Sequence, residues 1–216
     1  MGNPTAAEER GAIEAEVAGA FDAGDHDRAV TIILRAYGPE ILRFLAALHR
    51  DEDDAAEVFS GFAESIWKGA PSFERRCSAR TWAYAVARGA SLRFRTSTRR
   101  REARFKPFPE GSALSEIEAR VRTETLSFLR TERRARLTAL RDALPPEDQM
   151  LLMLRVDRQL AWNNLAVVLA DGAAPASEEA QKREAARLRK RFQILKDKLR
   201  EMGKREGLLG DDRDGR

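Results

Sequence analysis

Apolar residues recur along almost the whole chain at the three- and four-residue spacing of amphipathic helices. No alternating apolar and polar stretch bounded by turn residues stands out, so the pattern predicts an all-α protein. Proline and glycine clusters separate the helical segments, for example at Gly38 and Pro39 and at residues 105–112. The predicted helices span residues 6–23, 26–37, 39–50, 53–68, 78–98, 115–143, 146–155, 160–170 and 177–206.

The break at residues 105–112, FKPFPEGS, contains two prolines and follows an arginine-rich run, so we place a domain boundary there. With 216 residues, the chain is long enough for each half to bury a core of its own. The predicted organisation is two helical bundles joined by a linker, with a helix-turn-helix in the second. Its parts are an N-terminal helical domain at 1–104, a linker and connecting helix at 105–143, a C-terminal domain at 144–206 and a disordered tail at 207–216.

Composition excludes several classes of protein. The single cysteine, Cys77, cannot form an intramolecular disulfide, and the two histidines, His26 and His49, have no partners at metal-ligand spacing. No glycine-rich phosphate loop and no nucleophile with a paired base occurs, so we expect neither a cofactor nor an enzyme. The longest apolar run is far below the roughly 18 residues of a membrane span. The N-terminus begins polar and acidic, and we expect a cytoplasmic protein.

The net charge is only +4, from 39 basic and 35 acidic residues, but the basic excess lies in two blocks. From Arg75 to Arg104 there are ten arginines, no lysine and one acid, Glu102. On a helix, one side of this block would carry Arg80, Tyr84, Arg88, Ser91 and Arg95, and the opposite side Trp82, Val86 and Gly89. Guanidinium groups grip phosphates and aromatic rings stack on unpaired bases, so the first side favours single-stranded or opening nucleic acid. The alternative is a solvated basic face beside a core tryptophan.

The second basic block lies in the last predicted helix, after two short helices and a turn. This order is typical of a helix-turn-helix, whose second helix enters the major groove of DNA. The block sets six cations against one acid, Glu184; the cations are Lys182, Arg183, Arg187, Arg189, Lys190 and Arg191. A buried stripe of Leu188, Phe192, Leu195 and Leu199 would leave Arg187, Lys190 and Arg191 pointing outward. The alternative is a solvated surface or a coiled-coil arm.

Three strings occur in one order: DDAAEVFSGFAESIW at 53–67, SF-x3-CSARTWAYAVARG at 72–89 and LPPEDQMLLMLR at 144–155. Together with the helix-turn-helix that follows, they resemble the bacterial sigma-70 family, most closely its two-domain extracytoplasmic-function type. The resemblance covers residues 37–202. It implies a subunit that directs core RNA polymerase to promoters, opens the minus-ten element and initiates transcription.

The resemblance also implies partners and residue roles. The partners are the polymerase β′ subunit, promoter DNA and an anti-sigma protein. Docking on polymerase would fall to Asp54, Glu57, Val58 and Phe59, although Val58 and Phe59 also suit a core. The minus-ten element would be bound by Phe73, Arg80, Trp82, Tyr84, Arg88, Arg93 and Arg95, with the loop at 73–78 capturing a flipped base. The minus-thirty-five element would be read by Lys182, Arg187, Arg189, Lys190 and Arg191.

The chain departs from the family pattern at several positions. Ser60 and Gly61 replace a common Gln-Glu pair, Gly89 replaces a common asparagine, and Ala161 removes a helix cap. About a dozen extra residues lengthen the helix-turn-helix turn, which either extends the recognition helix backward or tilts it away from the groove. Two alternatives therefore stay open: a freestanding helix-turn-helix regulator that binds duplex DNA, and a sigma-like adaptor that binds polymerase without initiating.

Overall fold

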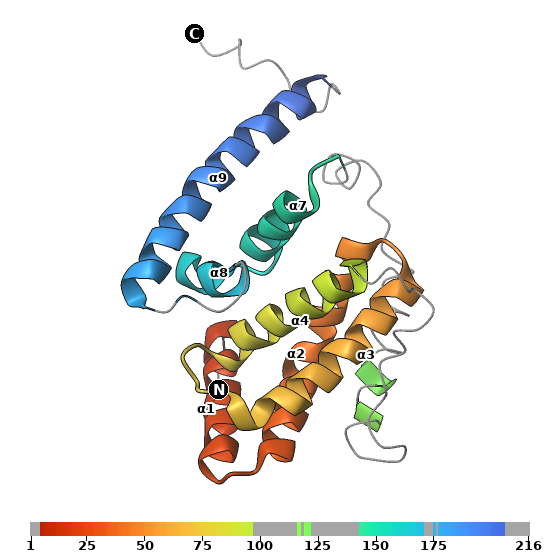
Figure 1. Ribbon diagram of the computed structural model, residues 1–216, viewed down its shortest axis with the longest axis vertical. Helices are drawn as coiled ribbons and strands as arrows, with labels where there is room; N and C mark the ends of the chain where they lie inside the picture. Colours follow the sequence, from red (N-terminus) through yellow and green to blue (C-terminus); the bar gives the residue numbers. More distant parts are fainter. Residues whose placement is uncertain are drawn as a thin grey trace. The chain divides into compact units, whose positions relative to one another are not determined.

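The structure is a computed structural model, and it describes residues 5–96, 116–117, 119–121, 143–170, 175 and 177–205. Every regular element within these residues is helical, which confirms the predicted all-α class. The chain divides into two compact units, Met1–Glu132 and Arg133–Arg216 (Figure 1). The division falls inside the predicted linker at 105–143, most of which lies outside the described residues, as does the predicted tail. The domain limits therefore stay predictions.

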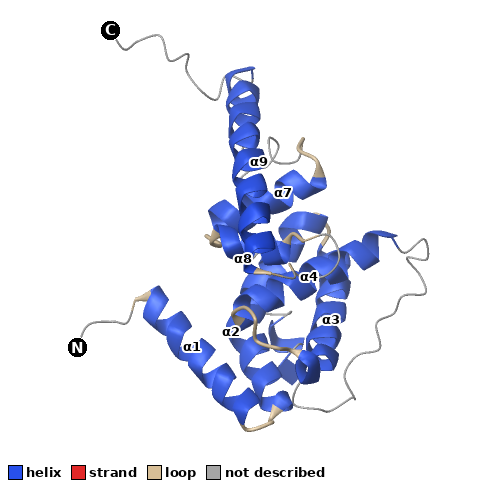
Figure 2. Ribbon diagram, turned by 60° about the vertical axis from the view of Figure 1, so that its left-hand side comes forward, coloured by secondary structure: helices blue, strands red, loops and turns tan. Residues whose placement is uncertain are grey.

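The first unit is a bundle built around α2 (Figure 2). Its helices are α1 (Ala6–Asp22), α2 (His26–His49), α3 (Glu52–Gly69) and α4 (Ala79–Thr96), with a short 3-10 helix, η1 (Ala70–Ser72), after α3. Thr5 begins α1 through a reciprocal capping box with Glu8, and Asp51 caps α3 by accepting the backbone N–H of Asp54. The helix α2 packs against α1, α3 and α4, so it carries most of the core.

The predicted break at Gly38 and Pro39 is wrong, because α2 runs through both residues as one helix. A proline inside a helix removes a backbone hydrogen bond and crowds the preceding turn. Here burial offsets that cost, because apolar residues on both sides of Pro39 share one continuous buried stripe. Its members include Ile33, Leu34, Tyr37, Ile41, Leu42, Phe44 and Leu45. Gly38 allows a close approach, since a Cβ there would lie 3.1 Å from Cγ1 of Val121.

The second unit contains α7 (Pro146–Leu152), a π-helical turn, η2 (Met153–Asp157), α8 (Trp162–Val168) and α9 (Glu178–Arg205). Leu144, Leu152 and Leu195 form its buried cluster, against which the partly buried Phe192, Leu199 and Met202 pack. Leu188 is buried on the same helix, so the predicted apolar stripe of α9 is confirmed. Ser177 caps α9 by accepting the N–H of Ala180, and the helix therefore starts well before the basic block. Part of the lengthened turn lies outside the described residues, so its effect on the recognition helix stays a prediction.

None of the described helices combines the length and the apolar character needed to cross a membrane. Likewise, the described ranges hold no group of three or more His, Cys, Asp or Glu side chains that could bind a metal ion.

Candidate nucleic-acid interface

The side of α4 that faces the bundle includes residues that the helical pattern placed on the exposed face. Tyr84 has no solvent-exposed surface and packs edge-on against Phe44 of α2, with ring centroids 5.5 Å apart. Ser91 is buried on the same side, and its Oγ lies 2.8 Å from Nε2 of His49. The expectation that Tyr84 stacks on a promoter base is therefore wrong, because the ring is enclosed by packed helices.

Small residues explain this orientation. Ala83, Ala87 and Ala90 are fully buried, and Phe94 is nearly so, so these positions define the side of α4 that packs on the bundle. Alanine lets two helix backbones approach closely, and the tyrosine beside this stripe is then carried into the core. The spacing of aromatic residues and arginines did not reveal the orientation of α4, because the alanines were not considered as packing residues.

Arg80 forms an intramolecular ion pair and does not extend a phosphate track. Its Nε and Nη2 donate to Oε1 and Oε2 of Glu40 at 2.7 and 3.0 Å, and its guanidinium lies over the ring of Tyr84. The two charged side chains are only 16% and 20% exposed. Burial alone would lower the pKa of Arg80, but the hydrogen bonds and the charge of Glu40 outweigh it and raise that pKa. The placement of Arg80 on an accessible basic face is therefore corrected.

Arg88 and Arg95 lie at the edge of the buried side of α4. Arg88 is half-buried, whereas Arg95 is exposed and donates from Nη2 to the carbonyl oxygen of Leu48 at 3.2 Å. Partial burial lowers the pKa of Arg95, and repulsion by Arg50 adds to this effect. Contact between these two arginines and DNA stays a prediction.

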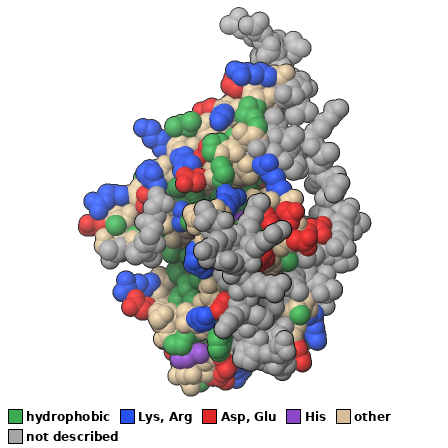
Figure 3. All heavy atoms as spheres, turned by 45° about the vertical axis from the view of Figure 1, so that its right-hand side comes forward, with side chains coloured by type: hydrophobic (Ala, Val, Ile, Leu, Met, Phe, Trp, Pro, Cys, Tyr) green, Lys and Arg blue, Asp and Glu red, His purple; other side chains and the backbone are tan. Residues whose placement is uncertain are grey.

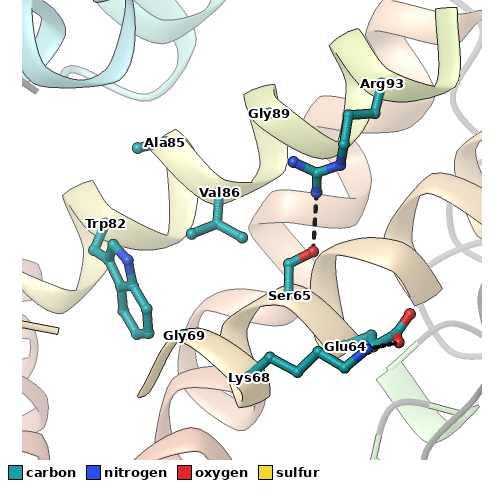
Figure 4. A pocket seen from close by; sticks show the side chains of 9 residues that line it. All are labelled: Glu64, Ser65, Lys68, Gly69, Trp82, Ala85, Val86, Gly89 and Arg93. Atoms are coloured by element: carbon teal, nitrogen blue, oxygen red, sulfur yellow. Dashed lines mark hydrogen bonds and ion pairs between the residues drawn. The ribbon is translucent and has the colours of Figure 1, made fainter. Parts of the chain in front are cut away.

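A groove of about 700 Å³ runs between the exposed side of α4 and the end of α3 (Figure 4). Trp82 lies at one end and Arg93 at the other, with Val86 between them; Ser65 and Lys68 line the opposite wall. Arg93 donates from Nη2 to Oγ of Ser65 at 2.9 Å, and Lys68 pairs with Glu64. The groove thus offers one aromatic ring, apolar side chains and two cations, beside the acid Glu64. An aromatic ring together with cations is typical of sites that bind single-stranded nucleic acid.

Two glycines line this groove, and one of them permits a close approach. A Cβ at Gly69 would lie 3.3 Å from Cζ2 of Trp82, so the bare backbone lets the indole approach the end of α3. A Cβ at Gly89 would lie 3.4 Å from Nη1 of Arg93, in ordinary van der Waals contact with that guanidinium. Sequence reasoning missed Ser65, Lys68 and Gly69. The signal available was Lys68, a cation just before the break at residues 69–73.

The loop at residues 73–78, here called the capture loop, leads directly into α4. Phe73 stacks on Trp82 with ring centroids 4.2 Å apart and an angle of 12° between the planes. Ser78 accepts the N–H of Thr81 and so caps the first turn of α4. The loop thus places a second aromatic ring beside the one at the end of the groove, in the order Phe73 then Trp82 that the sequence predicts.

The residues near the acidic start of α3 lie partly at the surface and partly in the core. Val58 and Phe59 are fully buried, so their assignment to a polymerase-docking surface is wrong, and they act as core residues. Asp54 and Glu57 remain half-buried at the surface of the helix. Docking through these two carboxylates stays a prediction.

The basic side chains of α9 differ in their contacts. Lys182, Arg187, Arg189 and Lys190 are all exposed, and Lys182 pairs with Glu178 and Arg187 with Glu184. On the face drawn in Figure 3, acidic side chains likewise stand among the basic ones. Arg189 lies over the ring of Trp162, 5.8 Å from its centroid. The predicted outward direction of Lys190 is consistent with its exposure.

Arg191, predicted to point outward, instead ties α9 to α7. Its Nε donates to Oδ1 of Asp148 at 2.7 Å and its Nη1 to Oε2 of Glu147 at 3.1 Å. Burial alone would lower the pKa of Arg191, but the hydrogen bonds and charges of these two acids outweigh it and raise that pKa. The two acids at the start of α7 thus neutralise a cation that the helical pattern had assigned to DNA.

We expect Arg191→Ala to lower the free energy of unfolding of the second unit by about 1 kcal/mol, because the pair is partly solvated. Thermal unfolding followed by circular dichroism measures this loss. Lys190→Ala is the matched control, since it removes a neighbouring cation that is exposed. Equal unfolding temperatures for both variants would argue that Arg191 does not hold α7.

Comparison with known families matches residues 33–101 to sigma-70 region 2. The match spans most of α2, all of α3, the capture loop and α4, whereas α1 and the second unit lie outside it. Region 2 is a domain of transcription initiation factors, and the residues that line the groove lie within the matched segment. The similarity to the sigma-70 family is shown for this segment of the chain. Comparisons with curated proteins and with solved structures gave no match.

Proposed function

We propose that this protein is a sigma factor of the extracytoplasmic-function type, which brings core RNA polymerase to a promoter and opens the minus-ten element. The observation that carries the proposal is the groove between α3 and α4, which lies within the region 2 match and joins Trp82 to Arg93. The small size of the chain is consistent with this type.

In this proposal the displaced strand enters the groove. One base joins the stack of Phe73 and Trp82 at the end of the groove, and Arg93 and Lys68 donate hydrogen bonds to phosphates. Unstacking a base from the duplex costs a few kcal/mol, which the new stacking and charge contacts offset. Lys68 already pairs with Glu64, and Arg93 with Ser65. An incoming phosphate would therefore replace Glu64 and Ser65 as the partners of these two cations.

The second unit anchors the complex upstream in this proposal. The exposed side of α9, with Lys182, Arg187, Arg189 and Lys190, approaches the minus-thirty-five element, while Arg191 ties α9 to α7. Gln181 also joins α9 to α8, because its side-chain Nε2 donates to the backbone oxygen of Asn163. The polymerase β′ subunit would meet α3 at Asp54 and Glu57.

The decisive experiment is run-off transcription with core polymerase and the full chain. Promoters are first selected from a library with randomised minus-ten and minus-thirty-five sequences, by retention on the reconstituted complex. We expect transcripts that start at one position and depend on both the selected promoter and the chain. Absence of transcript together with absence of polymerase binding would refute the proposal. Polymerase binding without transcript would point to the adaptor alternative.

Binding to duplex DNA distinguishes a freestanding regulator from a sigma factor. A regulator of that kind binds duplex tightly without polymerase, with an affinity that falls steeply with salt. The groove favours the sigma factor, because its aromatic end suits an unpaired base better than a closed duplex. We therefore expect the isolated chain to bind the selected promoter duplex poorly in a gel-shift assay.

We expect Asp54→Lys to weaken polymerase binding by about tenfold, since close charge pairs at interfaces contribute about 1.5 kcal/mol or more. Fluorescence anisotropy with labelled chain and core polymerase measures this affinity. A lysine in a first helical turn also opposes the helix dipole, so Glu9→Lys, in the first turn of α1, is the matched control. Equal affinities of the two variants would remove Asp54 from the docking surface.

A further inference from the structure

We propose that α1, which precedes the region 2 match, holds the capture loop in the conformation that receives a promoter base, with Glu14 as the positioning residue. Three separate contacts from α1 reach this loop and the first turn of α4. The inference rests on the proposed function, because it assigns α1 a role in opening the minus-ten element.

The first contact is the carboxylate of Glu14. Its Oε2 accepts the backbone N–H of Ala79 at 2.8 Å, and its Oε1 accepts the N–H of Arg80 at 3.0 Å and the hydroxyl of Tyr37 at 2.8 Å. The first N–H groups of a helix have no partner inside the helix, and a negative charge is favoured there. A charged acceptor shared by two of these groups fixes the point where the loop enters α4.

The second contact is aromatic. The ring of Phe21, at the end of α1, lies 5.5 Å from the ring of Phe73 at a tilt of 57°. Phe73 in turn stacks on Trp82 at the end of the groove. The loop aromatic is therefore held between a ring of α1 and a ring of α4.

The third contact lies at the strained residue of the loop. Arg75 has a φ of 55°, in the left-handed region that residues other than glycine rarely adopt. Its Nη1 donates to Oδ1 of Asp22 at 2.6 Å. An exposed ion pair contributes little alone, but this one joins the strained residue to the end of α1.

These contacts matter for opening because a loop that is already ordered pays less conformational entropy when it binds. Without Glu14 the first turn of α4 loses its charged acceptor, and Phe73 can sample positions away from Trp82. Base capture then has to order the loop as well as unstack the base. We therefore infer that α1 accelerates opening without touching DNA itself.

Cys77 provides a reporter for this arrangement, because it is the only cysteine of the chain and lies within the capture loop. Burial raises the pKa of its thiol to about 11, and the negative charge of Glu14 contributes to this rise. Only the thiolate reacts with iodoacetamide, so the alkylation rate depends on Glu14 and on the cover that α1 gives the loop. This measurement needs neither DNA nor polymerase.

The first arm of the experiment measures alkylation of Cys77 in the full chain from about pH 7.5 to pH 10. We expect Glu14→Gln to move the pH profile to lower pH and to react about threefold faster at a fixed pH. Glu16→Gln is the matched control, because Glu16 is exposed on the same helix and lies 3.9 Å from Arg28. An unchanged profile in Glu14→Gln would overturn the assignment of Glu14.

The second arm measures opening of a selected promoter that carries 2-aminopurine in the minus-ten element, using core polymerase with each variant. We expect Glu14→Gln to open it about tenfold more slowly at unchanged polymerase affinity, since small misplacements of a positioned group are costly. Faster alkylation with normal opening would overturn the role of α1 in opening. If Glu14→Gln does not fold, Phe21→Ala, which removes the ring of α1 that contacts Phe73, takes its place, and unchanged alkylation of Cys77 together with normal opening would overturn the role of α1.

The two proposals fail in different ways. If the wild-type chain opens no selected promoter, the proposed function fails, and the role of α1 in opening fails with it. The alkylation profile still decides whether Glu14 holds the loop.

Discussion

Replacing Trp82 with alanine is expected to slow promoter opening by about 10- to 100-fold while polymerase affinity stays unchanged. A base stacked on an aromatic ring contributes about 1–3 kcal/mol, and each 1.4 kcal/mol corresponds to about a tenfold change. The variant removes the Trp82 ring, and Phe73 thereby loses the ring on which it stacks. Stopped-flow fluorescence of 2-aminopurine in the minus-ten element measures the rate of opening.

Trp67→Ala is the matched control for this experiment. Trp67 is half-buried in the same unit, and its Nε1 donates to Oδ1 of Asp27 at 2.9 Å, but it does not line the groove. We expect this variant to lose some stability and to open promoters at the wild-type rate. Equal slowing by the two substitutions would show that the unit as a whole, and not the groove, had been damaged.

Helical periodicity predicted the fold class and most helices of the described residues, because burial of an apolar stripe is a local property of sequence. The predicted limits of the first helix, 6–23, differ from those of α1, Ala6–Asp22, by one residue. The exception was the break at Gly38 and Pro39. There the packing of two helical segments against one core outweighed the local preference of proline, which no short window of sequence reveals.

The candidate site was predicted less well than the fold. The correct block of sequence was found, but the faces of α4 were partly interchanged. The interior contains Tyr84 and Ser91, and the groove takes Trp82, Val86 and Gly89 from the opposite side. Residue type favoured the arginine-rich face, whereas the buried alanines decided which side packs on the bundle.

Hydrogen-bond and ion-pair partners that are far apart in the sequence could not be predicted, for a different reason. Glu40 neutralises Arg80 across 40 positions, and Glu14 accepts the N–H of Ala79 across 65. Such contacts exist only once the tertiary fold has formed, so neither acid is marked by any local pattern. The same holds for Asp148, which engages Arg191 across 43 positions.

Tyr84→Ala is expected to lower the free energy of unfolding of the first unit by about 3–5 kcal/mol, the range found when a buried aromatic ring is replaced by alanine. The ring is fully buried and contacts Phe44, so its removal leaves a cavity between α2 and α4. Urea unfolding followed by circular dichroism measures the loss. Since typical domains unfold with only 5–15 kcal/mol, a loss of this size removes a large share of the total stability.

Tyr84→Phe separates a core role from a role in DNA binding. This variant keeps the ring, so we expect a loss of stability below about 1.5 kcal/mol and opening at the wild-type rate. A Tyr84→Ala variant that kept full stability but lost opening would contradict burial and return Tyr84 to the interface. Trp82→Ala is expected to behave in the opposite way. It slows promoter opening and lowers stability less than Tyr84→Ala does, because the ring of Trp82 is only half-buried. The two aromatic residues, two positions apart on one helix, thus serve the core and the groove separately.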